Sequence, residues 1–238
     1  SEPIKLIIPM AGEGVAGKNP HANPFLEIAG KPILHHIIEN ATAIIDNPPE
    51  EISFIINKDA HSLKKGLEKV VQQFGSQVNY YVQEEPLGTA NALYCASKSL
   101  SGQVFIVFAD TLFESDFQLK GSKFNAIWVK KVEVPEKFGV VRLNELDEII
   151  DFVEKPQGFV SNLALVGAYY IRDALLLRKE LEVLMQQGAQ TAPLTDALKA
   201  MMHKKIFFEP AVSKKWFDCE DMADLLAANQ YYLEKIEP

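Results

Sequence analysis

Two hydrophobic patterns alternate along the first 110 residues. Continuous apolar runs rich in β-branched residues, typical of strands buried on both faces of a parallel sheet, lie at residues 4–10, 51–57, 78–83 and 103–110. Segments with helical spacing of apolar residues separate them, at residues 31–45, 59–74 and 88–100. Pro32 fits the first turn of the first helix. This alternation predicts βαβ units and a parallel sheet.

The pattern changes after Asp110. Closely spaced strand candidates without intervening helices follow, at residues 124–134, 138–144, 148–154 and 164–171. They predict an antiparallel or mixed extension of the sheet. Two helices, a strand and a last helix are then expected at residues 173–188, 192–205, 205–212 and 219–236. One apolar face is predicted for the last helix, made of Met222, Leu225, Leu226, Tyr232, Leu233 and Ile236. Without repeats or a linker, residues 1–238 are expected to form one α/β domain.

Composition narrows the classes of partner. With 47% hydrophobic and 24% charged residues, the chain has the make-up of a globular protein. A formal net charge of -8 disfavours nucleic-acid and anionic-membrane partners, although a local cationic pocket could still bind a small anion. Two cysteines, Cys95 and Cys219, are too few for a disulfide framework or a zinc site. A cytoplasmic protein with reduced thiols is therefore expected. No apolar run is long enough for a membrane helix.

The segment AGEGVAGKNP, at residues 11–20, has the glycines and the lysine of a phosphate-binding loop. Gly12, Gly17 and Lys18 match the G-x-x-x-x-G-K part of a P-loop. The next position needs a hydroxyl for magnesium, but it holds Asn19. Pro20 disfavours a regular helix at the lysine, which that motif requires. The sequence therefore favours a different kind of phosphate-binding loop.

The wider stretch LIIPMAGEGVAGKNPHANPFLEIAGKPILHHIIENA resembles the opening of the sugar-1-phosphate nucleotidyltransferases, the NDP-sugar pyrophosphorylases. Gly12 and Gly14 match the family's loop, and the segment 30–32 matches its Gly-Lys-Pro helix start. Further segments match in order: VQEEPLGTANAL, VFIVFAD, FGVVRLNELDEIIDFVEKP, NLALVGAYYI and WFDCEDMADLLAANQYYL. The resemblance implies a Rossmann-like mixed sheet in a three-layer α/β/α fold. It also implies a nucleotide-binding half at about residues 1–112 and a sugar-phosphate-binding half at about residues 113–238.

The resemblance also assigns roles to individual residues. Nucleotide-binding residues would be Ala11, Gly12, Gly14, Gln83, Pro86, Gly88 and Thr89. Sugar-binding residues would be Gly139, Glu154, Lys155, Val166 and Gly167. Asp110 and Asp218 would bind Mg²⁺, and Lys155 would hold the attacking phosphate. The implied reaction joins a nucleoside triphosphate to a sugar-1-phosphate, or a similar phosphate, and releases pyrophosphate, which depends mainly on positioning and charge neutralisation.

Three positions depart from the family pattern. Ala16 stands where the family loop has an arginine, and Asn23 stands where a later segment has a lysine. Ala109 replaces the glycine before the strand-end aspartate. Lys18, two residues past the arginine position, is the catalytic candidate that could supply the missing charge. Two functions are therefore left open: a working nucleotidyltransferase, and a catalytically reduced homologue that binds nucleotide or sugar nucleotide as a regulatory or partner subunit.

Simpler interpretations of the same residues also remain. Asp110 could begin a turn, Asp218 could cap the last helix, Gln83 could close a strand edge and Lys155 could be a solvated hairpin residue. A glycosyltransferase of related fold is disfavoured because the segment ADTLFE lacks an Asp-x-Asp metal motif. The nucleobase, the sugar and the oligomeric state, homo-oligomers included, are left open by the sequence.

Overall fold

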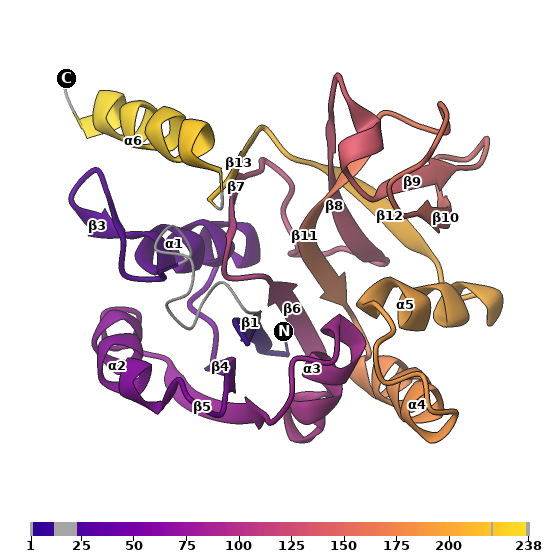
Figure 1. The fold of residues 1–238 in the computed structure, drawn as a ribbon, viewed down its shortest axis with the longest axis horizontal. Coiled ribbons are helices and arrows are strands. Elements are labelled where there is room, and N and C mark those ends of the chain that lie inside the picture. Colours follow the sequence, from indigo (N-terminus) through magenta and orange to yellow (C-terminus); the bar gives the residue numbers. More distant parts are fainter. Residues whose placement is uncertain (1, 12–22, 220, 237–238) are drawn as a thin grey trace.

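The computed structural model describes residues 2–11, 23–219 and 221–236, and these residues form a mixed sheet of nine strands (Figure 1). The strands are β1 (Ile4–Pro9), β4 (Glu51–Asn57), β5 (Gln77–Gln83), β6 (Gln103–Val107), β8 (Asn125–Lys131), β9 (Val140–Leu143), β10 (Ile149–Val153), β11 (Leu163–Ile171) and β12 (Phe208–Val212). Their order is β10-β9-β11-β6-β1-β4-β5, and β8 pairs with both β11 and β12.

The direction of the strands changes after β6, as the sequence predicts. β1 is parallel to β4 and to β6, and β5 is parallel to β4. Next to β6 runs β11, which is antiparallel to it and to β8 and β9. One half of the sheet is therefore parallel and is covered by crossover helices. The other half is mixed, and most of its strands follow one another in the sequence without a helix between them.

Helices cover both faces of the sheet, which confirms the predicted three layers. They are α1 (Ile33–Ile45), α2 (Lys64–Gln72), α3 (Thr89–Cys95), α4 (Ala174–Gln186), α5 (Leu194–His203) and α6 (Met222–Ile236). Helices α1 and α2 pack with one set of strand residues, which includes Leu6 and Ile8. Helices α3, α4 and α5 pack with the opposite set, which includes Ile7 and Ile106. Continuous apolar strands thus supply a core on each side of the sheet.

Short elements that the sequence pattern did not predict complete the fold. They are the strands β2 (Glu27–Ile28), β3 (Lys31–Pro32), β7 (Thr111–Glu114) and β13 (Lys215–Asp218), and the 3₁₀ turns η3 (His61–Leu63), η4 (Ser97–Ser99) and η5 (Pro135–Lys137). Pro32 lies in β3 and directly precedes α1, rather than lying in its first turn. Segment 215–218 pairs antiparallel with β7, so α6 begins at Met222 rather than at residue 219.

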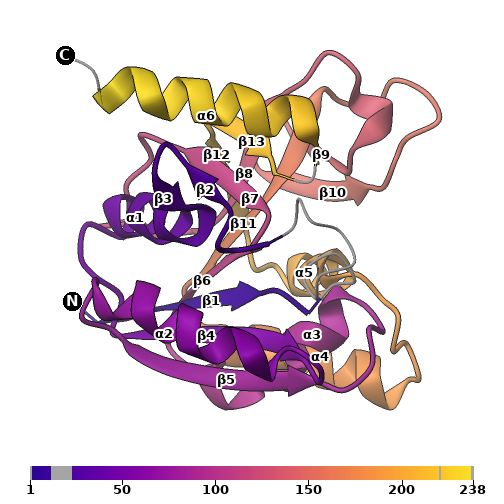
Figure 2. The same ribbon diagram turned by 60° about the vertical axis from the view of Figure 1, so that its left-hand side comes forward.

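Helix α6 buries a narrower face than the one predicted. Leu225 and Tyr232 are buried, but the other four residues of the predicted apolar face are exposed: Met222 50%, Leu226 66%, Leu233 44% and Ile236 63%. The helix lies at the edge of the molecule and contacts β13 and β2, so only a narrow strip of it is covered (Figure 2). The predicted apolar face is therefore only partly buried.

Candidate functional site

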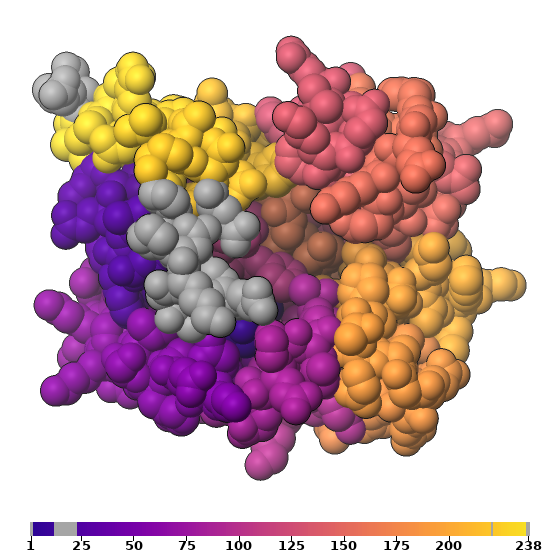
Figure 3. Space-filling model, viewed as in Figure 1, coloured from indigo at the N-terminus to yellow at the C-terminus, as the bar shows by residue number. Residues whose placement is uncertain are grey.

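A cavity of about 420 Å³ lies beyond the carboxyl end of β6. In Figure 3 this face is hollowed between α6, the segment that carries β9 and β10, and α5. Ligands of open α/β sheets usually bind at the carboxyl ends of the strands. The described residues of the cavity wall include seven that the sequence assigned to the site: Thr89, Asp110, Gly139, Glu154, Val166, Gly167 and Asp218.

The two expected metal ligands enter the cavity from one pair of strands. Asp110 comes just before β7, and Asp218 is the last residue of β13, aligned with Thr111 in the antiparallel ladder. The Cys219 N–H donates to the Asp110 carbonyl at 3.3 Å, which ties the two segments together. Burial and the negative charge of Asp218 raise the pKa of the Asp110 carboxyl. The fold therefore holds two carboxylates where their charges oppose each other.

Asp218 does not cap the last helix. The Asp221 side chain accepts the Asp224 N–H at 3.0 Å, and the Asp221 carbonyl accepts the Leu225 N–H, also at 3.0 Å. Asp221 is therefore the N-cap of α6. Asp221 thus fills the N-cap position that the sequence had offered to Asp218, and Asp218 is among the described residues of the cavity wall.

Thr111 links the aspartate segment to the expected sugar-binding strand. Its hydroxyl lies 3.3 Å from Asp110 Oδ1 and 3.3 Å from the Val166 carbonyl, so it can donate to either oxygen. The next residue, Gly167, has φ +104° and its carbonyl accepts the Phe108 N–H at 3.1 Å. Val166 and Gly167 lie at an irregularity of the β11–β8 ladder, between Leu165 and Tyr169.

The hairpin side of the cavity has Glu154 and an aromatic pair. A Cβ on Gly139 would lie 2.9 Å from Glu154 Oε2, so any larger residue here would require the Glu154 carboxylate to move. The rings of Phe138 and Trp216 lie 5.3 Å apart between centroids, and both line the cavity. Lys155 donates its N–H to the Phe138 carbonyl, but its side chain is exposed and is not among the described wall residues.

The expected nucleotide-binding residues are only partly gathered at this cavity. The Thr89 hydroxyl accepts the Leu194 N–H at 2.7 Å and lines the wall. Gln83 is buried, and its amide donates to the Gly88 carbonyl at 3.1 Å and to Asn91 at 2.9 Å. A Cβ on Gly88 would lie 2.9 Å from the Thr191 carbonyl oxygen, so this glycine allows close packing of two loops.

Other predicted residues are not among the described residues of this wall, or lie outside the described residues of the chain. Ala11 is buried after β1, and Pro86 is exposed; neither is among the described residues of the wall. Gly12, Gly14 and Lys18 lie outside the described residues, as does Ala16. Their assigned roles stay predictions from the sequence.

Charge in the described part of the cavity is entirely negative. Its charged residues there are Asp110, Glu154 and Asp218. Among the described residues, no group of three or more His, Cys, Asp or Glu side chains could hold a metal ion. Mg²⁺ is commonly bound by one or two carboxylates together with substrate phosphates and water. The pair Asp110 and Asp218 fits this mode, because a divalent cation would offset both the repulsion between the two carboxylates and the cost of burying the Asp110 charge.

Sequence reasoning did not assign nine of the sixteen described residues of the wall, and several of these nine border on assigned residues. Thr111, Phe138 and Trp216 each lie one or two positions from a residue that was assigned: Asp110, Gly139 and Asp218. Strand alternation could have indicated Trp216, because residues two apart share a face of β13. Nothing local in the sequence indicates that Thr111 contacts β11.

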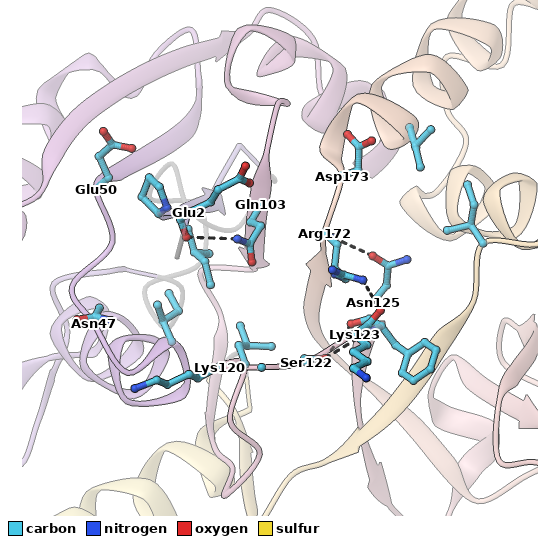
Figure 4. A pocket seen from close by; sticks show the side chains of 18 of the residues that line it. Glu2, Asn47, Glu50, Gln103, Lys120, Ser122, Lys123, Asn125, Arg172 and Asp173 are labelled. Atoms are coloured by element: carbon cyan, nitrogen blue, oxygen red, sulfur yellow. Dashed lines mark hydrogen bonds between the residues drawn. The ribbon is translucent and has the colours of Figure 1, made fainter.

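A larger cavity, of about 930 Å³, lies at the opposite end of the sheet (Figure 4). It is lined by the first residues of β1 and β6, Ile4 and Gln103, so it faces the amino ends of these strands. Three basic and three acidic side chains line its described wall: Lys120, Lys123, Arg172, Glu2, Glu50 and Asp173. Arg172 is held there by protein contacts, because its N–H donates to Asn125 and its guanidinium to the Lys123 carbonyl. No residue predicted for the site lines this cavity, within the part of the chain described.

Helices of the described chain are all too short or too polar to cross a membrane.

Known proteins resemble this chain over most of its length. The chain is 32% identical over 223 residues to "Bifunctional protein GlmU" of Methanococcus vannielii, which covers 90% of this chain and 51% of the relative. It is 29% identical over 222 residues to "Mannose-1-phosphate guanylyltransferase catalytic subunit beta" of Drosophila pseudoobscura pseudoobscura, which covers 90% of this chain and 57% of the relative. The chain thus spans about half the length of the curated relatives it matches.

Solved structures share the fold over nearly the whole chain. A UDP-glucose pyrophosphorylase complexed with UDP-glucose matches with a TM-score of 0.78 and 21% identity, covering 98% of this chain and 100% of that one. A putative glucose-1-phosphate thymidylyltransferase from Bacillus anthracis matches with a TM-score of 0.80 and 20% identity, covering 97% and 96%. The profile of the family described as "Nucleotidyl transferase" matches residues 19–235. With this match, and with 32% identity to a relative over 90% of its own length, the chain belongs to the nucleotidyl transferase family.

Proposed function

We propose that this chain transfers a nucleotidyl group from a nucleoside triphosphate to a sugar-1-phosphate. The observation that carries the proposal is the convergence of Asp110 and Asp218 in one cavity with Glu154 and Gly167. An oxygen of the sugar phosphate forms a bond to the α-phosphorus, the bond between the α- and β-phosphates breaks, and pyrophosphate leaves with the electron pair. Positioning and charge neutralisation supply most of the rate enhancement of such transfers.

The cofactor we propose is Mg²⁺, held by Asp110 and Asp218. When bound, the ion would neutralise charge on the phosphate oxygens of the reactants. The cavity itself needs this contribution, because its described charged residues are all acidic and would repel a triphosphate. Two lysines are the protein cations that we propose for the phosphates. The exposed Lys155 would hold the sugar phosphate, and Lys18, which lies outside the described residues, would face the triphosphate.

We propose that the two halves of the chain bind different substrates. Residues of about 1–112 would bind the nucleotide, with Gln83 and the segment around Gly88 facing the base. Residues of about 113–238 would bind the sugar phosphate, through Gly139, Glu154 and the strand that carries Gly167. The wall of the cavity draws residues from both halves, Thr89 and Asp110 from the first and Gly139 and Asp218 from the second. The two cysteines are free thiols. Because free thiols are usual in the cytoplasm, we propose a cytoplasmic location.

A second function deserves a test because of one specific observation. Asn23, which replaces the family's lysine, is used in the fold: its side chain accepts the Phe25 N–H at 2.9 Å, and its carbonyl accepts the Leu26 N–H at 3.1 Å. This Asx turn is a structural use of the position, since asparagine commonly stabilises turns in this way. A regulatory or partner subunit that binds nucleotide or sugar nucleotide without transferring it would keep the Asx turn at Asn23. It would not need the lysine that the family has at this position.

Pyrophosphate release separates these two functions. A panel of nucleoside triphosphates and sugar-1-phosphates would be assayed with Mg²⁺, next to thermal-shift measurements with the same ligands. The transferase predicts turnover in the usual enzyme range of about 1–10³ s⁻¹ for one pair of substrates. Ligand-dependent stabilisation without pyrophosphate release would instead support the catalytically reduced homologue.

A further inference from the structure

The start of α6 contacts the segment that carries Asp218. Asp224 lies in the first turn of this helix, and its Oδ2 accepts the backbone N–H of Asp218 at 2.8 Å. The Asp218 carbonyl in turn accepts the Asp221 N–H at 3.1 Å. The last residue of β13 is therefore held at both its backbone groups by the beginning of α6.

This use of Asp224 differs from ordinary helix capping. In a capping box, the side chain at the third helical position reaches back to the N–H of the N-cap residue itself. Asp221 is the N-cap here and already accepts the Asp224 N–H at 3.0 Å. The Asp224 carboxylate reaches three residues farther back, to Asp218. The hydrogen bond to Asp218 is thus additional to the cap of α6.

The neighbouring contacts explain why the Asp218 backbone needs a fixed position. Asp218 is aligned with Thr111 at the end of the β7–β13 ladder, so pairing with β7 ends beside Asp110. The next amide, of Cys219, donates to the Asp110 carbonyl at 3.3 Å. Consecutive amides at residues 218 and 219 are therefore bound by Asp224 and by Asp110. Together they fix the separation of the two segments from which the carboxylates project.

We infer that Asp224 is a positioning residue for metal binding: by holding the Asp218 amide, it keeps the Asp218 carboxylate beside that of Asp110. This inference rests on the proposed function, because it takes Asp110 and Asp218 as the ligands of the metal. Partners that orient metal ligands commonly contribute about 10–100-fold in metal affinity, although they do not touch the ion.

Three variants separate this role from helix capping and from charge. Asp224→Ala removes the acceptor of the Asp218 amide. Asp224→Asn keeps an acceptor oxygen but removes the negative charge. Asp221→Ala removes the side-chain cap of α6 and leaves the bond between Asp224 and Asp218. Binding of Mn²⁺ alone would be measured by electron paramagnetic resonance of the free ion, with unfolding monitored for each protein.

Asp224→Ala is expected to weaken Mn²⁺ binding by about tenfold or more, with Asp224→Asn and Asp221→Ala within about threefold of the wild type. In the pyrophosphate assay, Asp224→Ala is expected to raise the KM for Mg²⁺ and to change kcat little at saturating Mg²⁺. Equal Mn²⁺ binding by wild type and Asp224→Ala would overturn the inference, as would equal losses in Asp224→Ala and Asp221→Ala, or in Asp224→Ala and Asp224→Asn. A wild type that binds no Mn²⁺ would overturn the two-aspartate site itself, a distinct outcome.

Discussion

Gly167 and Thr111 contact each other so closely that no side-chain carbon fits between them. A Cβ on Gly167 would lie 2.7 Å from Thr111 Oγ1, and the φ of Gly167 is +104°. Thr111 in turn lies within 3.3 Å of Asp110 Oδ1. Gly167 of the proposed sugar-binding strand therefore contacts the proposed metal ligand Asp110 through Thr111.

Replacing this glycine is expected to affect both stability and metal binding. Gly167→Ala should lower the free energy of unfolding by about 1–3 kcal/mol, because an alanine is strained at this φ. The added carbon should also displace Thr111 and weaken the metal-dependent stabilisation by nucleotide. Urea unfolding and thermal shifts with Mg²⁺ and nucleoside triphosphate would measure the two effects.

Gly188 provides a matched control for backbone strain alone. Its φ is +79°, and a Cβ there would meet no atom within 4 Å. Gly188→Ala should cost stability without changing the response to Mg²⁺ and nucleotide. If both variants respond to ligand as the wild type does, the contact between Gly167 and Thr111 does not support the site.

The regular part of the fold was predictable from periodicity. Buried parallel strands such as β1 and β4 are continuous apolar runs, and α1 and α4 have helical spacing, so local sequence defines them. The pair β7 and β13 was not predicted, because each has only four residues and each is stabilised by a partner about 100 residues away. Short strands of this kind depend on tertiary pairing rather than on a local pattern.

The candidate site divides in the same way. Asp110, Glu154 and Asp218 were found by resemblance of short segments, and the cavity gathers them. Thr111 was missed because its partner Val166 lies 55 residues away. The sequence did not indicate how much of the apolar face of α6 is covered, because helical spacing identifies apolar positions but not which neighbours cover them.

A second prediction concerns the missing loop arginine. Ala16→Arg together with Asn23→Lys is expected to raise pyrophosphate release by at least about tenfold, a small part of the roughly 10³–10⁵ that an arginine can supply in phosphoryl transfer. The physical reason is the negative charge of the cavity wall, which the added cations would offset. Initial rates at fixed Mg²⁺ would measure the gain.

Single variants separate the two substitutions. Asn23→Lys removes the side-chain acceptor of the Phe25 N–H and should lower the melting temperature. Ala16→Arg leaves that turn intact, so it should give most of the gain at less cost in stability. No gain in either protein that contains Ala16→Arg would mean that the loop does not place this position near the phosphates.

Asp110→Asn is expected to stabilise the metal-free protein and to abolish its stabilisation by ligand. Burial and the Asp218 charge raise the pKa of the Asp110 carboxyl, so its charged form opposes folding at neutral pH. A neutral amide should therefore raise the melting temperature of the metal-free protein. The same variant should abolish the additional stabilisation by Mg²⁺ and nucleotide, because a carboxylate ligand is lost.

Asp151→Asn is the matched control for the loss of a carboxylate. Burial alone would raise the pKa of Asp151, but the hydrogen bond from Lys199 and the charges of Lys199 and Arg142 lower it. This carboxylate therefore favours folding when charged, and the amide should lower the melting temperature. Its ligand-dependent shift should stay that of the wild type. A retained Mg²⁺ effect in Asp110→Asn would remove Asp110 from the metal site.

The last prediction is a pH dependence of stability that comes from His36. This side chain is buried in α1, its Nε2 lies 2.7 Å from the Ile28 carbonyl, and its ring lies 4.5 Å from that of Tyr232 in α6. Burial lowers the pKa of His36 despite the hydrogen bond to the Ile28 carbonyl, which raises it. Below the ordinary histidine pKa of about 6.5, the unfolded chain therefore binds more protons than the folded one at this residue.

The contribution of His36 to the free energy of unfolding is therefore expected to be fully present above about pH 6.5. It should be lost as the pH falls toward the lowered pKa of this residue. One proton limits the slope to about 1.4 kcal/mol per pH unit. Urea unfolding of wild type and His36→Gln between about pH 5 and about pH 7.5 would measure it. Glutamine retains a donor for the Ile28 carbonyl but does not titrate, so its stability should depend less on pH in this window, even if lost ring packing lowers it throughout. Equal slopes in the two proteins would show that another group carries the pH dependence, because only the titration of residue 36 differs between them.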